Sequence, residues 1–297
     1  MTLQAKLLRE LIQKKSIVKV CGAYDAMSAK LVELNDFDAI WSGSFAVSAT
    51  HGVPDASILT MSEFFDAAKN MVETCNIPVL ADCDTGYGGP SNVRHMVKKY
   101  ERAGIAGISI EDKVFPKQNS LLKNGKQDLL PEKDFVGKII TAKDAKEDPD
   151  FLIIARIEAL IAELGMDEAI QRAKAYEKAG ADALVIHSKK NTADEVLEFA
   201  DTWGGHLPLV SIPTTYSSVT IDELESHKFK FVIYANQTLR VAYSAISGLL
   251  KQMVKAKSIS EVDDKLSSME EIFKLQKMYE LEEQEIILEE KYKKLGY

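Results

Sequence analysis

The sequence predicts an α/β fold, a (β/α)8 barrel over residues 1–256 that is followed by a helical extension over residues 257–297. Eight short apolar runs recur along the chain, and helical patterns separate them. Their near-continuous Val, Ile, Leu and Ala content is typical of parallel strands that are buried on both faces. Eight strand–helix units in about 240 residues match a barrel, which usually has about 250 residues. A doubly wound open sheet is the alternative, but no GxGxxG turn follows the first strand.

The expected strands are residues 16–22, 38–43, 77–84, 105–112, 151–158, 182–188, 207–212 and 230–236. The expected helices are residues 60–75, 92–103, 132–146, 167–179 and 238–255. In the helix from 167 to 179, Ala169, Ile170 and Ala173 keep helical spacing and acidic residues lie in the first turn. Gly180 follows as a C-terminal cap.

The extension over residues 257–297 is rich in charged residues and has the composition of a helix. Its apolar positions include Ile272, Leu275, Met278 and Leu281. One interpretation is a tail that packs on its own barrel. Because the apolar positions exceed what a completed barrel requires, we favour contact with a neighbouring subunit.

Composition limits the classes of partner. The chain has 297 residues, 46% hydrophobic and 28% charged, with a net charge of −8, which argues against a nucleic-acid surface. Three cysteines, Cys21, Cys75 and Cys83, lack metal or redox spacing and indicate a reduced compartment. The first 16 residues lack the apolar core of a signal peptide, and no run approaches the ~18 apolar residues of a membrane span. We therefore expect a cytoplasmic protein, and an anionic small molecule would need local cations that overcome the overall negative field.

Polar side chains gather at the carboxyl ends of the expected strands, where barrels of this class have their active sites. The set is Ser42, Gly43, Ser44, Asp82, Asp84, Glu111, Arg156, Glu158, His187, Ser188, Ser211, Thr214 and Asn236. Since these ends meet at one rim of a barrel, we expect the side chains to share one mouth.

Three carboxylates in this set predict a metal site. Asp82 and Asp84 are two residues apart, so strand alternation points both to one side, and Glu111 ends the next strand. Uncompensated, these acids would repel one another, whereas Mg2+ accepts oxygen ligands and retains waters. Alternatively, the acids cap helices or pair with Lys113 and Lys117.

Two cationic or titratable residues end the fifth and sixth strands. The planar guanidinium of Arg156 suits a carboxylate or phosphate, although a buried salt bridge to Glu158 or Glu111 is the alternative. His187 could donate to an anionic oxygen or serve only as a structural hydrogen-bonding group.

Two loops could complete the mouth. Gly43, Ser44 and Phe45 offer closely spaced backbone N–H groups that can hold anionic oxygens, although small residues are also common in ordinary turns. Residues 113–131 form a long loop of the kind that often serves as a lid. Pro116 and the sequence KNGK would also fit an ordinary surface excursion.

Five motifs carry a resemblance over nearly the whole chain: EDKVFPKQNS, ADCDTGYG, ARIEAL, AGADALVIHSKK and VIYANQTLR. With them, the sequence resembles the isocitrate lyase/phosphoenolpyruvate mutase superfamily, and within it the phosphoenolpyruvate mutases. The resemblance implies a barrel whose eighth helix is exchanged between subunits of a homodimer or homotetramer. It implies a Mg2+-dependent interconversion of phosphoenolpyruvate and phosphonopyruvate.

The resemblance also implies roles for individual residues. Asp82 resembles the direct metal ligand, and Asp84 and Glu111 resemble residues that hold metal-bound waters. Arg156 and His187 resemble the partners of the substrate anion.

Further roles fall on the loops. Asp55, in a loop that the residues alone mark only as a turn, resembles the essential aspartate beside the migrating phosphoryl group. Asn119 resembles the lid asparagine that touches this group, and Lys117 and Ser120 belong to the same loop. The backbone of residues 43–45 resembles part of the substrate cradle, although the family often has Ser-Gly-Leu there.

Other activities remain alternatives. Phosphonopyruvate hydrolases resemble this chain closely but place threonine where it has Asn119. Carbon–carbon lyases of the superfamily use a lid cysteine, and here no cysteine follows Cys83. A barrel that has lost catalysis and acts as a scaffold is a third alternative, which the intact set of strand-end residues argues against.

Overall fold

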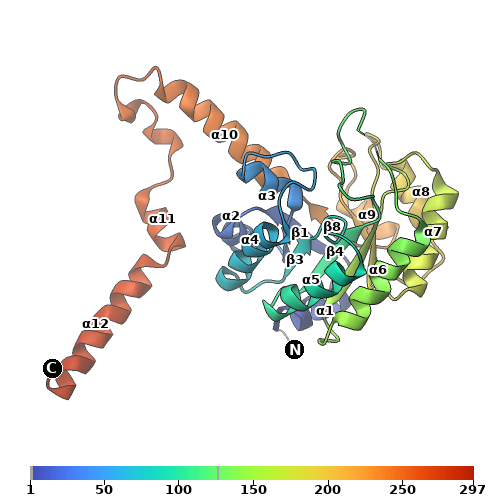
Figure 1. Cartoon of the computed structure of the whole chain (residues 1–297). Helices are drawn as coiled ribbons and strands as arrows, with labels where there is room; N and C mark the ends of the chain where they lie inside the picture. The colour runs from blue at the N-terminus through green and yellow to red at the C-terminus, as the bar shows by residue number, and fades with distance from the viewer. Residues whose placement is uncertain (1–2, 126) are drawn as a thin grey trace. The chain divides into compact units, whose positions relative to one another are not determined.

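A computed structural model describes residues 3–125 and 127–297, and the chain divides into two compact units, Met1–Leu239 and Arg240–Tyr297. The first unit is a closed barrel of parallel strands in the order β1 to β8 (Figure 1), as the sequence predicts. Its strands are β1 (Val18–Ala23), β2 (Ala39–Ser42), β3 (Val79–Asp82), β4 (Gly107–Glu111), β5 (Leu152–Ile157), β6 (Ala183–Ile186), β7 (Leu209–Ser211) and β8 (Phe229–Tyr234).

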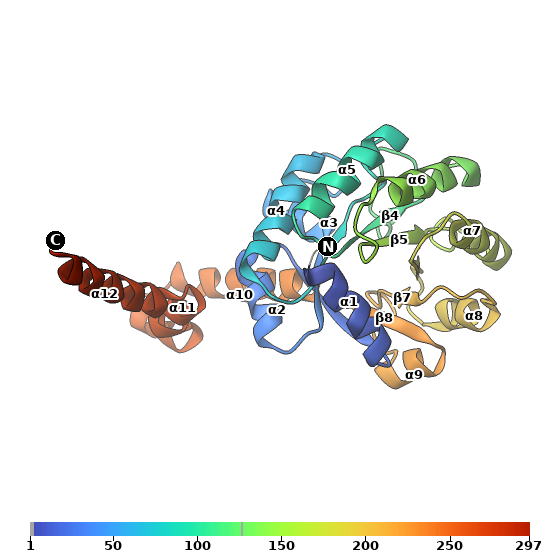
Figure 2. The ribbon, with the colours of Figure 1, turned by 90° about the horizontal axis from the view of Figure 1, so that it is seen from below.

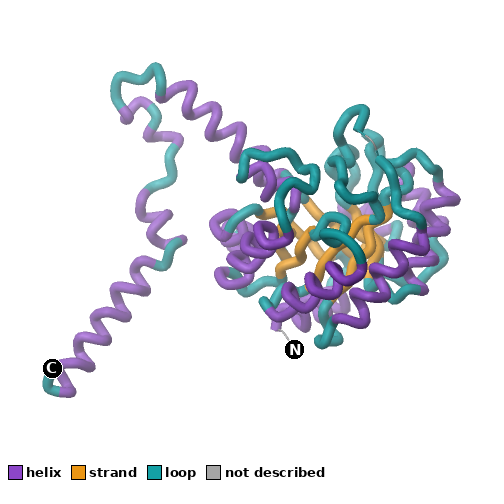
Figure 3. The backbone as a smooth tube through the Cα atoms, viewed as in Figure 1, coloured by secondary structure: helices purple, strands orange, loops and turns teal. Residues whose placement is uncertain are grey.

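Helices surround these strands, as Figures 2 and 3 show. They are α1 (Leu3–Lys14), α2 (Ala26–Leu34), α3 (Ser44–Thr50), α4 (Met61–Thr74), α5 (Pro90–Arg102), α6 (Glu132–Ala145), α7 (Met166–Lys178), α8 (Asp194–Thr202) and α9 (Ile221–Ser226). Gly180 has φ of +96° just after α7, so the predicted left-handed cap is confirmed.

Strand alternation divides the apolar core into two parts. In β5, Leu152 and Ile154 belong to the cluster that fills the barrel, and Ile153 belongs to the cluster between strands and helices. At the amino-terminal end, Leu8 of α1 packs into the inner cluster, and the Gln4 amide bonds the backbone at both Cys75 and Val79. Helix α1 therefore closes the barrel at the amino-terminal ends of its strands. The carboxyl ends of the strands form the mouth at the other end.

The second unit is helical. Its elements are α10 (Gln237–Met253), which begins just before the unit does, the 3-10 turns Ile259–Glu261 and Asp263–Lys265, α11 (Met269–Leu275) and α12 (Met278–Leu295). The helical composition of residues 257–297 is confirmed, while the compact unit already begins at Arg240. No residue of α10, α11 or α12 is buried within the described chain.

No helix in residues 3–125 or 127–297 is long and apolar enough to cross a membrane.

Candidate active site

Alternation along the strands decides which polar groups face the mouth. Arg156 continues the inward series of Leu152 and Ile154, and it pairs in register with Glu111 of β4. Asp82 continues the series of the inward Leu80. The predicted convergence of these strand ends is therefore what the barrel register produces.

We define the lid as residues 113–131. Its Lys117 is surrounded by four acidic side chains, those of Asp55, Asp82, Asp84 and Glu111. The Lys117 Nζ lies 2.6 Å from Asp84 Oδ1 and 3.0 Å from Asp55 Oδ1. Asp82 accepts hydrogen bonds from the Ser44 hydroxyl at 3.0 Å and from the Asp84 backbone N–H at 3.2 Å. The alternative that acids at the mouth pair with Lys117 is thus realised.

The buried carboxylates of this cluster need a positive charge nearby to remain ionised. Burial raises the pKa of Asp84 to about 7, although Lys117 opposes the shift. Burial likewise raises the pKa of Glu111. Burial would lower the pKa of Lys117, but Asp84, Glu111 and Asp55 outweigh it and hold that pKa well above its usual range. Lys117 is therefore charged and acts as an internal counter-ion.

The cluster also fits a divalent cation. Among the described residues, Asp55 Oδ1, Asp84 Oδ1 and Glu111 Oε1 are buried side-chain oxygens that receive no hydrogen bond of good geometry. Oxygen donors of this kind suit Mg2+. In the arrangement found here no three His, Cys, Asp or Glu side chains of the described chain have the geometry of a metal site. The ammonium of Lys117 instead contacts two of the three free oxygens.

A second charged group lies beside the first. Arg156 Nε lies 2.5 Å from Glu158 Oε1 and 3.4 Å from Glu111 Oε2, so the salt bridges considered as an alternative are both present. Burial would raise the pKa of Glu158, but the neighbouring cations, Arg156 before Lys113, hold it well below its usual range. Glu158 is therefore an ionised carboxylate with no exposed surface.

The imidazole of His187 is held in one tautomer. Its Nδ1 lies 2.8 Å from Arg156 Nη2, and a guanidinium can only donate, so Nδ1 is the acceptor and the proton is on Nε2. Burial, followed by the charge of Arg156, lowers the pKa of His187, which fits a neutral ring. Glu158 Oε1, 3.0 Å from Nδ1, is then a close neighbour rather than an acceptor.

The lid reaches the mouth through three residues that the sequence singled out. Lys117 enters the acidic cluster, the Asn119 Nδ2 donates to Asp55 Oδ2 at 2.7 Å, and the Ser120 hydroxyl donates to Glu158 Oε2 at 2.6 Å. A bridge between Lys113 and Leu129 ties the two ends of this loop together. The lid is therefore held over the carboxyl ends of the strands by specific contacts.

The loop after β2 contributes a side chain to the site. Gly43 caps α3 without a side-chain bond, and the buried Ser44 hydroxyl accepts from Lys117 Nζ at 3.2 Å besides donating to Asp82. Phe45 is 43% exposed. Ser44 thus joins the site through its side chain, and the backbone cradle at residues 43–45 stays a prediction.

Sequence reasoning passed over two residues that the structure places at the centre. Glu158 was noted only as a strand end and as an alternative salt-bridge partner of Arg156, and Lys113 only as a possible partner for acids. Lys113 Nζ lies 3.2 Å from Glu158 Oε2, and their side chains are 2% and 0% exposed. A signal existed, because both follow an inward strand residue by two positions, Glu111 and Arg156 respectively.

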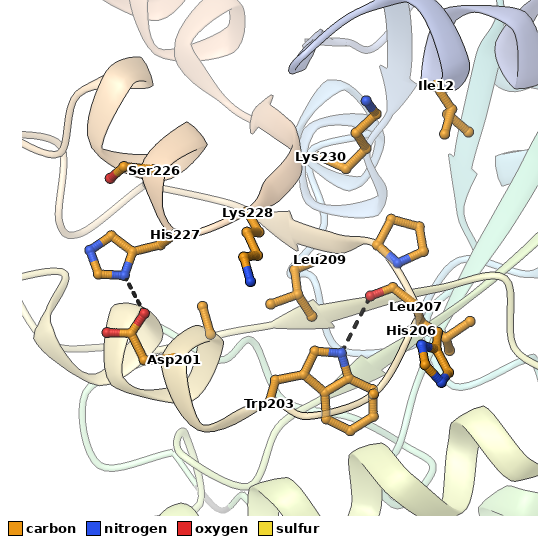
Figure 4. Close-up of a pocket in the computed structure, with 13 residues that line it drawn as sticks. Ile12, Asp201, Trp203, His206, Leu207, Leu209, Ser226, His227, Lys228 and Lys230 are labelled. Carbon is orange, nitrogen blue, oxygen red and sulfur yellow. Dashed lines mark hydrogen bonds and ion pairs between the residues drawn. The ribbon is translucent and has the colours of Figure 1, made fainter.

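A separate pocket of about 490 Å3 lies at the opposite ends of the strands (Figure 4). Leu209, which begins β7, lines it together with Trp203, His206 and Lys228. None of the predicted site residues lines this pocket, and its only aspartate, Asp201, is paired with His227 at 2.7 Å. The chemistry that the sequence predicts is therefore confined to the mouth.

Comparison with known proteins identifies the family. Residues 8–254 match the family model described as phosphoenolpyruvate phosphomutase. The chain belongs to the phosphoenolpyruvate phosphomutase family. This confirms the resemblance and makes the protein an enzyme of the phosphoenolpyruvate mutase/isocitrate lyase superfamily.

Relatives of high similarity include both a phosphonopyruvate hydrolase and a phosphoenolpyruvate phosphomutase. Phosphonopyruvate hydrolase of Variovorax sp. (strain Pal2) is 42% identical over 91% of this chain and 93% of its own length. The crystal structure of phosphoenolpyruvate phosphomutase from Streptomyces platensis subsp. rosaceus is 44% identical, with a TM-score of 0.93, over 95% of this chain and 98% of that one. Phosphonopyruvate hydrolase in complex with oxalate and Mg++ is 39% identical, with a TM-score of 0.90, over 96% and 99%. Overall similarity does not separate mutase from hydrolase, so the distinction depends on the site.

Proposed function

We propose that the chain is a phosphoenolpyruvate mutase, an isomerase that interconverts phosphoenolpyruvate and 3-phosphonopyruvate. In the direction of phosphonate formation the bond between phosphorus and the C2 oxygen breaks, and a bond between phosphorus and C3 forms. Both bonds belong to one molecule, so the reaction consumes no water, reductant or second substrate. The reaction would begin a route to phosphonates, because it makes the carbon–phosphorus bond.

The contact between Asn119 and Asp55 carries this proposal. Asp55 Oδ2 accepts from the Asn119 amide at 2.7 Å, and Lys117 Nζ lies 3.0 Å from Oδ1. Both carboxylate oxygens of Asp55 are therefore held by N–H donors, which fixes the orientation of the carboxylate. The resemblance places threonine in the hydrolases where this chain has Asn119, and a threonine side chain is shorter and offers one donor hydrogen where the amide offers two.

The remaining residues suit a transfer through a loose, metaphosphate-like transition state, in which the protein mainly positions the reactants and stabilises charge. Arg156, charged and at the strand end, would bind anionic oxygens of the substrate, and His187 would donate from Nε2. Asp55 would orient the phosphoryl group, with Asn119 beside it. The lid would keep water from capturing that group.

We assign the cofactor as Mg2+, with Asp82 as a direct ligand and Asp84 and Glu111 contacting its waters. When bound it would supply positive charge for the enolate that develops during transfer. The buried free oxygens of the acidic cluster and the Mg++ complex of the hydrolase support this assignment.

Phosphorus NMR tests the proposal directly. Phosphonopyruvate is incubated with the full chain and MgCl2, and the products are followed by their chemical shifts. We expect the phosphoenolpyruvate signal to grow with no matching growth of inorganic phosphate. Inorganic phosphate with an equal amount of pyruvate would instead assign the hydrolase activity. No conversion, together with no binding of oxalate in the presence of MgCl2, would favour the scaffold alternative.

The hydrolase is the second candidate because a hydrolase relative is 42% identical over most of the chain. The orienting role that we propose for Asp55 has a test of its own. If Asp55 only orients the phosphoryl group, rapid quenching during turnover yields no phosphorylated enzyme. Recovery of a phosphorylated Asp55 peptide would overturn the orienting role.

The proposal extends to assembly and location. We propose a homodimer or homotetramer in which the second unit contacts a neighbouring subunit, because its helices bury no residue of their own in the described chain. We also propose a cytoplasmic location, since Cys21, Cys75 and Cys83 are free and buried.

A further inference from the structure

The lid is joined to the anion-binding pair, Arg156 and His187, by a chain of buried hydrogen bonds that the proposed chemistry does not use. We propose that Lys113, Ser120 and Glu158 form a latch through which lid closure fixes the orientation of Arg156. Glu158 and Lys113 are positioning residues in this inference. The part that concerns turnover rests on the proposed function, and the part that concerns binding does not.

Ser120 is the lid residue whose hydroxyl contacts the charged groups of the latch. It donates to Glu158 Oε2 at 2.6 Å and accepts from Lys113 Nζ at 2.6 Å and from Arg156 Nη2 at 3.0 Å. A hydroxyl has one donor hydrogen and two acceptor lone pairs. All of its capacity is therefore used, and each bond is to a charged partner, which is the stronger kind of hydrogen bond.

Lys113, the first residue of the lid, anchors the rest of the lid to the barrel. It follows β4 by two residues, and its ammonium contacts the Gln118 carbonyl at 2.9 Å, the Ser120 hydroxyl at 2.6 Å and Glu158 Oε2 at 3.2 Å. An ammonium has three donor hydrogens, so two of them serve lid atoms and the third serves the barrel. Withdrawal of the lid would leave a buried cation with only one partner, which is costly.

Glu158 connects the two groups because its two oxygens face different partners. Oε1 lies 2.5 Å from Arg156 Nε, and Oε2 takes the Ser120 hydroxyl and the Lys113 ammonium. Its own backbone N–H donates to Asp112 Oδ1 at 2.9 Å, which fixes the strand end. A displacement of Ser120 would therefore move the Glu158 carboxylate, and with it the Arg156 guanidinium that its other oxygen contacts.

Another lid contact provides a comparison without this connection. The Lys117 backbone N–H donates to the Ser57 hydroxyl at 3.0 Å, so Ser57 also holds the lid. No contact between Ser57 and Arg156, Glu158 or Lys113 is found in the described chain. Loss of the Ser57 hydroxyl should loosen the lid and leave the latch in place.

The first experiment measures binding and lid opening in the full chain without reference to turnover. Oxalate affinity in the presence of MgCl2 is obtained by calorimetry, and lid opening by amide hydrogen exchange of residues 113–125. For Ser120→Ala we expect faster lid exchange and an oxalate affinity about 10- to 100-fold weaker, because the bonds removed are to charged groups. Ser57→Ala should speed lid exchange and leave oxalate affinity within about twofold, the size of an ordinary surface change.

Two further variants separate positioning from folding. Ser120→Thr keeps the hydroxyl and should restore most of the oxalate affinity. Lys113→Gln keeps a neutral donor and should give an intermediate affinity. Wild-type oxalate affinity in Ser120→Ala would overturn the latch, as would an equal loss in Ser57→Ala and Ser120→Ala.

The second experiment follows products, with phosphorus NMR as the readout. A loosened latch should lower kcat and raise the share of inorganic phosphate among the products of Ser120→Ala, because water then reaches the phosphoryl group. If the wild-type chain converts no phosphonopyruvate, the proposed function fails while the oxalate and exchange data still decide the latch. An unchanged product ratio with weakened oxalate binding would limit the latch to binding and overturn its role in excluding water.

Discussion

The two compact units treat their side chains in opposite ways. In the unit Met1–Leu239, charged groups are buried with partners: the side chains of Lys113 and Glu158 are 2% and 0% exposed and lie 3.2 Å apart. In the unit Arg240–Tyr297, apolar groups are uncovered: Tyr243 and Ile246 are 76% and 58% exposed. Buried charge and exposed apolar surface are both unfavourable in isolation. The first is typical of a functional site, and the second is typical of a surface that contacts another molecule.

In the barrel, the cost of burying charge is balanced by partners of opposite sign that are fixed at the mouth. Removing one partner leaves the other unpaired, which is why such clusters are sensitive to single substitutions. In the second unit, the uncovered side chains cost little to alter in the isolated chain, and they are the ones that the proposed subunit contact would use. A substitution can therefore remove either a buried charged partner or an exposed apolar side chain, and the two should have different consequences.

The largest effect is expected at Asp55, where Asp55→Ala should lower the turnover of phosphonopyruvate at least about 1000-fold. The substitution removes the partner of both Lys117 and Asn119, which lie 3.0 Å and 2.7 Å from its carboxylate. Initial rates by phosphorus NMR measure the loss, and circular dichroism confirms that the barrel is folded. Activity above one tenth of wild type in a folded variant would contradict an essential role for Asp55.

The next effect concerns the uncovered face of α10. Tyr243, Ile246 and Leu250 keep helical spacing and are 76%, 58% and 56% exposed. Replacing Ile246 and Leu250 together with glutamate should place charge in the proposed subunit contact and weaken association about 100-fold. Light scattering after size exclusion measures the molar mass, which should fall toward 33.0 kDa at micromolar concentration.

Ser244→Glu is the matched control for this change, because Ser244 is exposed on the opposite side of the same helix. It should leave the molar mass unchanged. A wild-type chain that is already monomeric would refute the subunit contact, and so would a double variant that keeps the wild-type mass.

The barrel could be predicted from eight near-continuous apolar runs separated by helical patterns, and the convergence of its strand ends from side-chain alternation along each strand, which is local. Arg156 and Glu111 are 45 residues apart along the chain, yet each is inward by its own strand pattern, and register brings them together. The lid contacts could not be predicted in this way. That Lys117 lies among the acids, 2.6 Å from Asp84, depends on the path of a loop with no periodic pattern.

Asp55 and Glu158 show two further limits. Asp55 follows a proline in a loop, where aspartate usually serves turn formation, so only resemblance to a family marked it. Glu158 ends a strand and was visible, but its role depends on having two oxygens that face different groups. Such a division is a property of three-dimensional contacts and has no signature in the spacing of residues.

Lys117 allows a test of the internal counter-ion. Because the charge of Lys117 would compete with a divalent cation for the proposed site at Asp82, Asp84 and Glu111, Lys117→Met should strengthen the binding of Mn2+ without substrate by about 10-fold. Electron paramagnetic resonance of free Mn2+ measures the affinity. Lys123→Met, a change at an exposed lid lysine, should leave it unchanged. Equal or weaker binding by Lys117→Met would show that the acids do not form the cation site.

The smallest effect compares a partly buried carboxylate that has several partners with an exposed one. Asp182 accepts from Arg9 Nη2 at 2.8 Å, Lys143 Nζ at 2.9 Å and the Ile153 backbone N–H at 2.9 Å. Asp182→Asn should lower the free energy of unfolding at pH 7 by about 1–2 kcal/mol, since it removes charged hydrogen bonds. Asp201→Asn, at an exposed pair with His227, should change it by less than about 0.5 kcal/mol.

The pH dependence of that difference gives the sharper test. Burial would raise the pKa of Asp182, but Arg9, Lys143 and the Ile153 N–H outweigh it and lower the pKa below the unfolded value of 3.8. The stabilisation is therefore fully present above pH 3.8 and is lost as the pH falls through the lower, folded pKa. Urea unfolding at several pH values should show the gap between wild type and Asp182→Asn constant from pH 7 to 5 and narrowing below pH 4. A gap that widens in acid would reverse the assigned sign and mean that burial, rather than the two cations, governs this carboxylate.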